Sequence, residues 1–388
     1  MKKIIALLLA LLMVLALFAC KPADKESTTS PSDTGSTSPS ETGDDGDASA
    51  TAPHYDREPF TIVYLCRTLT FQWMQNIVTA MQSLREEYNY ELIATDTGGD
   101  TAQYPILIET YGDQGVDGMI IAPNEDTAQR CWELCQEMGV PLLFESTAMR
   151  DDNGELLTSG TELDAYQVGE SCAQWLADNY KNYWGDEDVG QSTLGFIGVT
   201  YSAIPNFTLR LNGVMETFKK NFADVPDNNY FVADIVSQAA MTAENAYNEV
   251  APIIAAHGDR IEKWMLVGVV CEWGQGGARV FEEYNLTQDA LICTAGGEAL
   301  LVEWEGGNVS DCWVACSYYE AMDYVEWLIP GMIEHLETGI PIEDLWPEWR
   351  EEGSSSLFAS VKVPGVPATY DTYKELVKVD YAALQKAQ

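Results

Sequence analysis

The sequence predicts an α/β fold made of two doubly wound lobes, each with a parallel sheet covered by helices. Its 388 residues are enough for two domains with separate hydrophobic cores. Short apolar runs alternate with longer segments whose apolar residues recur at helical spacing. The alternation occurs in two successive blocks, and strands that alternate with helices indicate parallel sheets with right-handed crossovers.

The first block opens with a strand, a polar turn and a helix. Phe60–Leu65 is rich in β-forming residues, Cys66–Thr70 is polar, and the apolar residues from Trp73 to Met81 fit a helix. Further strands are predicted at 90–95, 118–122, 141–144 and 156–160, with helices at 102–111 and 127–138. Gly139 is a good stop for the second of these helices.

The second block begins with a helix at 164–180 and contains five predicted strands. These strands cover residues 193–199, 230–236, 264–270, 290–293 and 312–316. The helices between and after them are predicted at 208–222, up to 254, at 276–284, at 298–304 and at 321–336. The two blocks are therefore similar in organisation, and the sequence shows no short repeat.

The first twenty residues have the pattern of a secretory signal peptide, with Lys2 and Lys3 before the apolar run Ile4–Phe18. The run ends in Leu17-Phe18-Ala19-Cys20, which resembles the lipobox of bacterial lipoproteins. By that resemblance Cys20 becomes the lipid-bearing N-terminus, and several acyl chains anchor a protein stably. We therefore expect residues 1–20 to be removed or lipidated and the chain to be held on the extracytoplasmic face of the cell membrane.

Residues 21–58 are rich in Ser, Thr, Pro, Gly, Asp and Glu, and we predict a disordered tether there. The whole chain has 61 acidic and 21 basic residues, a formal net charge of −40. Nucleic acid is excluded as a partner because phosphate recognition needs clustered Lys and Arg. The acidity is typical of a soluble, self-repelling protein, and an attraction for a cationic partner is the alternative.

Nine cysteines are present, and eight remain when Cys20 is set aside. An even number in an exported protein suggests disulfides. Several of the eight stand in apolar runs, however, where a free thiol packs as a small hydrophobe. Free buried thiols are therefore preferred to disulfides, and a zinc site is the least favoured alternative.

The loop after the first strand is the first candidate for ligand binding. It carries the cation Arg67 and the aromatic residues Phe71 and Trp73 at the carboxyl end of a strand. Open α/β sheets bind ligands at that edge, and such side chains can hydrogen-bond a polar ligand and stack on its flat face. The alternative is that Arg67 is a solvated charge and that the two aromatic residues belong to the core.

Residues 58–388 resemble the type I periplasmic binding proteins of the sugar-binding group, the arabinose-, ribose- and galactose-binding family. The segments that carry the resemblance are Val116–Asn124, Gly139-Val140-Pro141, Asp164–Gly169 and Arg210-Leu211-Asn212-Gly213. In that family a three-strand hinge joins the lobes and the ligand is enclosed between them by hinge closure. The resemblance implies crossings near 159–164, 316–319 and 341–346. The N-terminal lobe would comprise 59–163 and 318–345, and the C-terminal lobe 164–317 and 346–388.

The resemblance also implies which residues hold a ligand. The predicted ligand-binding residues are Arg67, Phe71, Trp73, Asn124, Glu145, Arg210, Trp273, Glu298 and Ser317. Aromatic rings cover the apolar faces of a sugar, and charged side chains satisfy its hydroxyls in pairs. The chain departs from the family at Cys271-Glu272-Trp273 and at Ala295, where amides are common. A larger, more aromatic site or a non-sugar ligand is the alternative, and each residue has a structural role as its own alternative.

Evidence for catalysis is thin, and we do not expect an enzyme, a cofactor or a bound metal. His54, His257 and His335 are scattered, and no hydrolase, metalloprotease or P-loop motif occurs. The turn Asp151–Gly154 is polar, and calcium binding there is the less favoured interpretation. We expect a monomeric lipoprotein that delivers a small polar ligand, foremost a sugar, to an ABC permease. The alternative is a sensory module that presents its closed form to a membrane receptor or histidine kinase.

Overall fold

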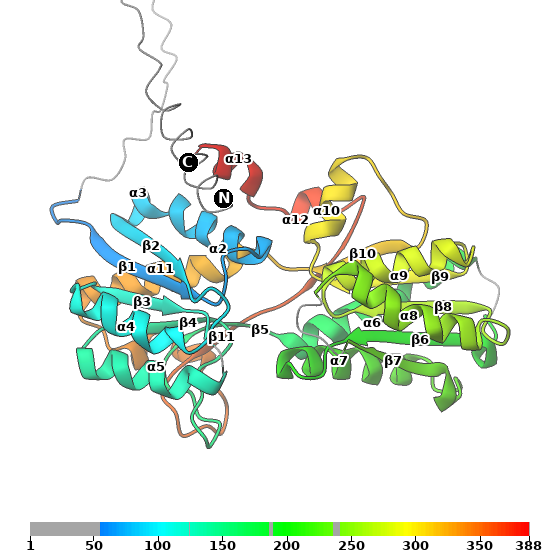
Figure 1. The fold of residues 1–388 in the computed structure, drawn as a ribbon, viewed down its shortest axis with the longest axis horizontal. Coiled ribbons are helices and arrows are strands. Elements are labelled where there is room, and N and C mark those ends of the chain that lie inside the picture. Colours follow the sequence, from blue (N-terminus) through cyan, green and yellow to red (C-terminus); the bar gives the residue numbers. More distant parts are fainter. Residues whose placement is uncertain (1–54, 124, 186–188, 236–240, 388) are drawn as a thin grey trace, which may run out of the picture. The chain divides into compact units, whose positions relative to one another are not determined.

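The computed structural model describes residues 55–387, except 124, 186–188 and 236–240. The predicted signal peptide, Cys20 and nearly all of the tether lie outside the described residues. Within the described part the strands form two six-stranded sheets, each flanked by helices on both faces (Figure 1). The prediction of two mostly parallel α/β lobes is confirmed.

The first sheet has the strand order β11-β5-β4-β3-β1-β2, and all its strand pairs are parallel. Its strands are β1 Phe60–Cys66, β2 Tyr90–Asp96, β3 Gly118–Ile121, β4 Leu142–Ser146, β5 Gly160–Leu163 and β11 Ser360–Val363. Its helices are α2 Gln72–Ser83, α3 Arg85–Tyr88, α4 Gln103–Asp113, α5 Glu125–Met138 and α11 Ala321–Thr338. We call this unit the first lobe.

The second sheet has the order β12-β10-β9-β8-β6-β7, in which only β12 runs antiparallel to its neighbour. Its strands are β6 Leu194–Thr200, β7 Tyr230–Asp234, β8 Lys263–Gly268, β9 Ala290–Ala295, β10 Trp313–Tyr318 and β12 Val366–Thr369. Its helices are α6 Ala165–Trp184, α7 Pro205–Asn221, α8 Ala243–His257, α9 Cys271–Glu283, α10 Glu298–Glu305 and the short α12 Tyr373–Leu376. We call this unit the second lobe.

Alternate residues of the central strands supply the cores on the two faces of each sheet. In β1, Ile62 and Tyr64 pack under α2 and α11, whereas Val63 and Leu65 pack under α4 and α5. All seven residues of β6 are buried because α6 and α7 cover one face and α8 and α9 the other. Strands buried on both faces have nearly continuous apolar sequences, which is why they were recognisable in the sequence.

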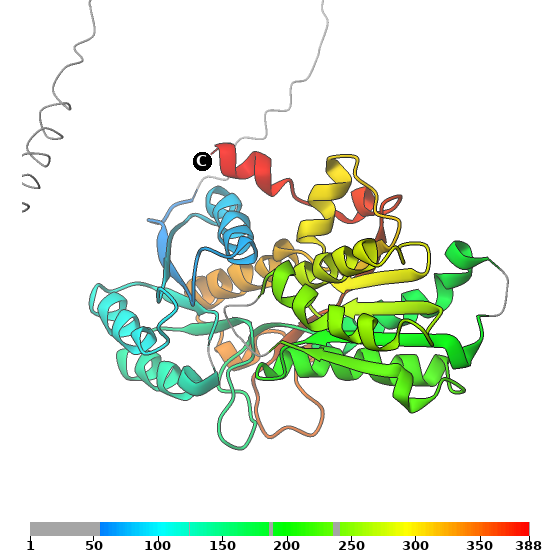
Figure 2. The same ribbon diagram turned by 45° about the vertical axis from the view of Figure 1, so that its right-hand side comes forward.

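The chain passes between the lobes after β5 at Leu163–Asp164 and after β10 at Tyr319–Glu320, close to the first two predicted crossings. The third crossing was predicted at 341–346, and this is wrong. Strand β11 pairs in parallel with β5, so the chain stays in the first lobe until Val363 and crosses only at Pro364–Gly365. The loop before β11 also lies beside the loop between β4 and β5 of the first lobe (Figure 2). Arg150 forms a 2.6 Å ion pair with Glu351 there.

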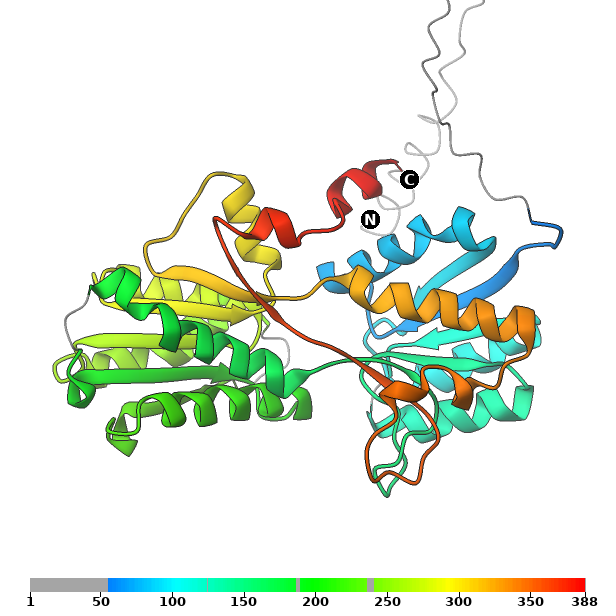
Figure 3. The same ribbon diagram turned by 180° about the vertical axis from the view of Figure 1, so that it is seen from behind.

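The C-terminal residues give a second correction to the predicted lobe boundaries. After β12 and α12 the chain continues to α13, Tyr381–Ala387, which packs on α2 of the first lobe (Figure 3). The backbone N–H of Met322 donates to the Tyr381 hydroxyl at 3.0 Å, and Gln385 Nε2 donates to Thr79 Oγ1 at 3.2 Å. Residues 346–388 therefore do not all belong to the second lobe.

The eight cysteines other than Cys20 are buried in the cores as free thiols. Within the residues described, no helix is both long enough and apolar enough to cross a membrane.

Candidate functional site

The carboxyl ends of the central strands place several predicted site residues close together. Helix α2 follows β1 and carries Trp73, and Glu145 lies near the end of β4. In the second lobe, α7 follows β6 and carries Arg210, while α10 follows β9 and begins at Glu298. These residues are the ones that the rule for open α/β sheets selects.

Tyr319, in the connection from β10 to α11, joins the aromatic and basic parts of this site. Its ring lies edge-on to the indole of Trp73, with centroids 5.4 Å apart. The guanidinium carbon of Arg210 lies 5.9 Å from the centroid of the same ring. Trp73 also packs against Tyr324 at 5.3 Å, at the start of α11. One tyrosine in a crossing segment thus contacts a residue of the first lobe and a residue of the second.

The side chain of Arg210 is held mainly by the second lobe. It is 8% exposed, its Nη1 donates to the backbone oxygen of Val269 at 2.7 Å, and it lies over the ring of Phe207 at 5.2 Å. Its Nε is buried without a hydrogen-bond partner. An N–H group in that situation is costly unless a ligand or water accepts from it.

Two glycines in the segments that resemble the family explain how Arg210 is positioned. A Cβ at Gly169 of α6 would collide with the backbone oxygen of Arg210, and a Cβ at Gly213 of α7 would collide with the backbone oxygen of Tyr166. Both residues must be glycine for α6 and α7 to approach this closely. The close packing of these helices fixes the backbone from which Arg210 projects.

Glu145 is fully buried and is bound by three side chains. The Tyr64 hydroxyl donates to it at 2.9 Å, the Ser146 hydroxyl donates to its other oxygen, and the Trp73 side chain also hydrogen-bonds to it. Burial raises the pKa of Glu145 to about 7, and these hydrogen bonds oppose the increase. The carboxyl of Glu145 in β4 therefore fixes the indole ring of Trp73 against the first sheet by a hydrogen bond.

Glu298 is affected electrostatically by both Glu272 and Arg210. The pKa of Glu298 is raised to about 7, mainly by burial and to a smaller extent by the charge of Glu272, whereas backbone N–H groups and Arg210 oppose the increase. Burial also raises the pKa of Glu272, in the first turn of α9. A Cβ added at Gly296 would lie 2.9 Å from Glu298 Oε2 and 3.3 Å from the Tyr319 hydroxyl oxygen. Carboxylate and hydroxyl therefore share the space above Gly296.

Other predicted residues have different surroundings. Ser317 is fully buried and its hydroxyl donates to Ser171 Oγ of α6 at 3.1 Å, so it faces the core between sheet and helix. Trp273 is 1% exposed and packs edge-on against Phe207 at 5.5 Å, which is the role of a packed core aromatic. Phe71 is 46% exposed at the N-cap of α2.

Two further predicted residues lie in loops that follow strands. Arg67 is half-buried, and its backbone oxygen accepts hydrogen bonds from the Gly99 N–H and the Thr97 hydroxyl. Asn124 lies outside the described residues.

The sequence prediction missed Tyr319, Tyr64 and the role of Glu272. Tyr319 stands in a segment that was predicted to cross between the lobes. Its contacts with Trp73 and Arg210 could not be predicted from the sequence. Tyr64 appeared to be an ordinary strand residue, and Glu272 was noticed only as a departure from the family.

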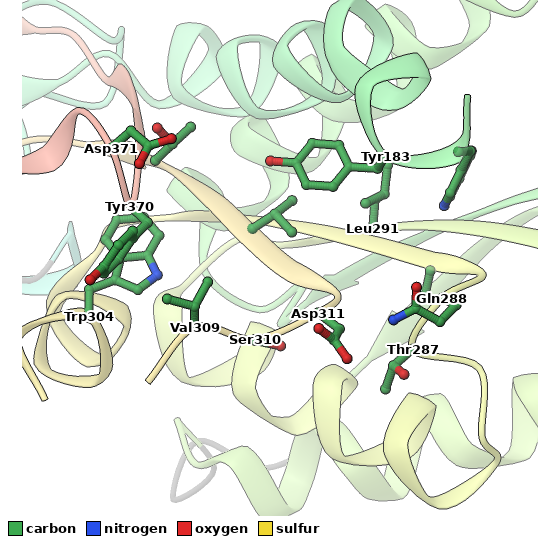
Figure 4. Close-up of a pocket in the computed structure, with 14 residues that line it drawn as sticks. Tyr183, Thr287, Gln288, Leu291, Trp304, Val309, Ser310, Asp311, Tyr370 and Asp371 are labelled. Carbon is green, nitrogen blue, oxygen red and sulfur yellow. The ribbon is translucent and has the colours of Figure 1, made fainter. Parts of the chain in front are cut away.

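A separate pocket of about 350 Å³ lies near the start of β9 and β10, at the opposite end of the second sheet from the site (Figure 4). Residues that line it include Tyr183, Trp304, Asp311 and Tyr370, and none of the predicted site residues is among them. This pocket therefore does not coincide with the predicted site, and the residues at the carboxyl ends of the strands remain the candidate site. Among the described residues, no group of three or more His, Cys, Asp or Glu side chains is arranged to hold a metal ion.

No curated protein matches the sequence. A periplasmic solute-binding protein of an ABC transporter from Actinobacillus succinogenes, with bound D-allose, is 15% identical, has a TM-score of 0.60 and matches over 81% of this chain and 99% of its own. A periplasmic ribose ABC transporter protein from Conexibacter woesei is 15% identical, with a TM-score of 0.62 and coverage of 84% and 97%.

A third similar structure is a myo-inositol-binding protein from Caulobacter, in complex with myo-inositol. It is 12% identical, with a TM-score of 0.62 over 81% of this chain and 95% of its own. At this level of identity the three structures establish a common fold. The family model described as "Periplasmic binding protein domain" matches residues 62–322, and the chain therefore belongs to the periplasmic binding protein family.

Proposed function

We propose that this protein is a lipid-anchored, extracytoplasmic binding protein that captures a small polar ligand, foremost a sugar, and delivers it to an ABC permease. The observation that carries the proposal is the contact of Tyr319 with both Trp73 and Arg210. Through it, residues from the two lobes converge at the carboxyl ends of both sheets.

The chemistry of these residues suits a polyhydroxylated ring. Trp73 and Tyr319 offer flat apolar surfaces for the ring faces, while Arg210 has a buried, unpartnered Nε that needs an acceptor. The carboxyl groups of Glu272 and Glu298 accept from ligand donors. Trp73, Tyr319, Glu272 and Glu298 are only half-buried, so a ligand can reach them.

Further support comes from the similar structures and from the N-terminal sequence. The names of the three structures include allose, ribose and myo-inositol, which are all small polyhydroxylated molecules. The signal-like run ending at Cys20 supports export and lipid anchoring. A Cys20→Ser variant should move from the membrane fraction to the soluble fraction, and unchanged membrane retention would contradict the anchor.

A thermal-shift screen of the mature protein tests the binding proposal. The panel contains pentoses, hexoses, inositols, disaccharides, sugar acids and nucleosides. A ligand at a hundredfold excess over its Kd stabilises the folded state by about 2.7 kcal/mol, which gives a clear increase in Tm. The Arg210→Lys variant should lose the response, whereas Leu209→Ala, on the exposed face of the same helix, should keep it. If no sugar or polyol shifts Tm, the sugar assignment is wrong.

Delivery to a permease requires a test in cells. Deletion of the gene should abolish high-affinity uptake of the ligand found in the screen, and the wild-type gene should restore it. Normal uptake in the deletion strain would refute the transport role.

A further inference from the structure

The pocket near the start of β9 and β10 is formed by segments of the second lobe that lie far apart in the sequence (Figure 4). Tyr183 comes from the last turn of α6, Trp304 from α10, Asp311 from the loop before β10, and Tyr370 from the loop after β12. Strand β12 brings Tyr370 to this place because it runs antiparallel to β10, so its carboxyl end lies beside the first half of β10. The pocket therefore belongs to the second lobe alone and is separate from the candidate site.

Several large apolar side chains of the pocket are exposed to solvent. Tyr183 and Tyr370 are 45% and 42% exposed, and Val309 is 55% exposed. The ring of Tyr183 projects into the pocket, and its hydroxyl points toward the side where Tyr370 and Asp371 lie (Figure 4). Exposed apolar side chains that gather in one hollow are typical of a binding surface, whereas single ones scattered over a surface are not.

The polar groups of the pocket have unused capacity for hydrogen bonds, both as donors and as acceptors. Trp304 is only 2% exposed, and its Nε1 is buried without a hydrogen-bond partner. The indole nitrogen is on the side of the ring that faces the interior of the pocket (Figure 4). The carboxyl groups of Asp311 and Asp371 form no hydrogen bond or ion pair with any residue that the structure describes. A buried N–H without an acceptor is costly, and a ligand oxygen that accepts from it removes that cost.

These groups together favour one class of ligand. An anion is disfavoured because two aspartates line the pocket and no Lys, Arg or His is among the described residues that do so. An ammonium has donors for the aspartates but no acceptor for the Trp304 N–H. A hydroxyl group both donates and accepts, so a polyhydroxylated ligand can pair with the carboxyl groups and with the indole. Its apolar faces can lie on the tyrosine rings.

We infer that this pocket is a second saccharide site, which binds a neutral sugar unit independently of the candidate site. Tyr183 and Tyr370 contact the apolar faces of the sugar, Asp311 and Asp371 accept from its hydroxyls, and Trp304 Nε1 donates to one of its oxygens. The volume of about 350 Å³ is within the range of small-ligand sites, about 300–1,000 Å³. This site goes beyond the proposed function and does not depend on it. Because it lies at the other end of the second sheet, both sites can be occupied together.

Fluorine NMR of the mature protein labelled with 5-fluorotryptophan tests this inference at Trp304 itself. The Trp304→Phe variant identifies the resonance of Trp304 among those of the 11 tryptophans. The probes are glucose, galactose, mannose, N-acetylglucosamine and their disaccharides, with glucuronate and glucosamine as charged counterparts. At least one neutral saccharide should shift the Trp304 resonance in a saturable way, with a Kd at least tenfold lower than that of its charged counterparts.

Substitutions identify the residues responsible. Asp371→Ala and Tyr370→Ala should each raise the Kd measured at Trp304 at least tenfold, because an acceptor or a stacking surface is lost. Asp259→Ala and Val302→Ala remove an exposed carboxyl group and an exposed apolar side chain elsewhere in the second lobe, and each should leave this Kd within twofold of wild type. Circular dichroism of each variant confirms that it is folded.

The Trp73→Ala variant separates the two sites. It disables the candidate site and should leave the response at Trp304 intact. If the response disappears in Trp73→Ala, the shift is a remote effect of a ligand at the candidate site, and the second site is refuted. If no neutral saccharide shifts the Trp304 resonance, or if a charged counterpart binds more tightly, the inference is wrong while the proposed function stands. If Trp304 responds to saccharides although none binds at the candidate site, the second site stands and the proposed function fails.

Discussion

Replacing Glu145 with glutamine should change how the stability of the protein depends on pH. Glu145 is fully buried, and burial raises the pKa of its carboxyl from the ordinary 4.5 to about 7. The folded state therefore holds the proton more tightly than the unfolded state does. The resulting contribution to stability is fully present below pH 4.5 and is lost as the pH rises through about 7.

The size of this effect follows from the pKa values. A tenfold change in an ionisation constant corresponds to about 1.4 kcal/mol. Between its ordinary pKa of 4.5 and about 7, the carboxyl of Glu145 contributes about 3 kcal/mol, most of which is lost between pH 5 and pH 8. Glutamine has nearly the same shape and no charge, so the variant lacks this pH-dependent contribution.

Urea unfolding, followed by the fluorescence of the 11 tryptophans, measures the effect. Measurements begin at pH 5 because the sequence pI of about 4.1 promotes precipitation at lower pH. Relative to wild type, Glu145→Gln should gain about 2 to 3 kcal/mol of unfolding free energy between pH 5 and pH 8. Glu109→Gln, on the exposed face of α4, controls for the loss of one surface charge. A difference between wild type and Glu145→Gln that is constant with pH, or that changes in the opposite direction, would refute the reasoning.

Three other substitutions have defined outcomes. Trp73→Ala should weaken the binding of the best ligand at least tenfold in calorimetry because a stacking surface is lost, and an unchanged Kd would remove Trp73 from the site. Gly296→Ala should weaken binding tenfold and lower the free energy of unfolding in urea by about 1 kcal/mol. The reason is that Gly296 has a φ of +81° and that an added Cβ would press on Glu298 Oε2. Wild-type affinity and stability would contradict this. Glu320→Ala should increase amide exchange in residues 377–387, because this carboxylate caps α11 and accepts the N–H groups of Lys378 and Val379; unchanged exchange would show that it does not hold the C-terminal segment.

Most of the fold was predictable because its strands are buried on both faces. Such strands have nearly continuous apolar sequences, and the helices between them show a clear period. Strand β5 was displaced in the prediction, from 156–160 to the observed Gly160–Leu163, because Glu162 interrupts the apolar pattern. That carboxylate is buried in β5 because Ser360 Oγ donates to it at 2.6 Å, the Lys362 ammonium pairs with it, and Arg150 forms an ion pair with it at 3.5 Å.

Two of the residues that bind Glu162, Ser360 and Lys362, belong to β11, about two hundred positions further along the chain. No local sequence pattern predicts that β11 pairs with β5 over that separation. The third crossing was misplaced for the same reason. Helix α9 was predicted to begin at Gly276, but it begins at Cys271. The prediction started too late because Gly274, Gly276 and Gly277 lower the helix propensity of the first turns. The glycines are there for packing: a Cβ at Gly276 would collide with the backbone oxygen of Ala243 in α8.

The order of the strands explains why part of the site was accessible from the sequence. In the first sheet β1 lies between β2 and β3, and in the second sheet β6 lies between β7 and β8. The crossovers therefore change direction next to β1 and β6, and ligands of open α/β sheets bind at such switch points. The helices that follow these strands are α2 and α7, which carry Trp73 and Arg210. The alternation of elements predicts parallel sheets, and therefore which loops lie at the carboxyl ends of the strands. Strand order came only from the structure, as did the contacts of Tyr319, which belongs to a crossing segment.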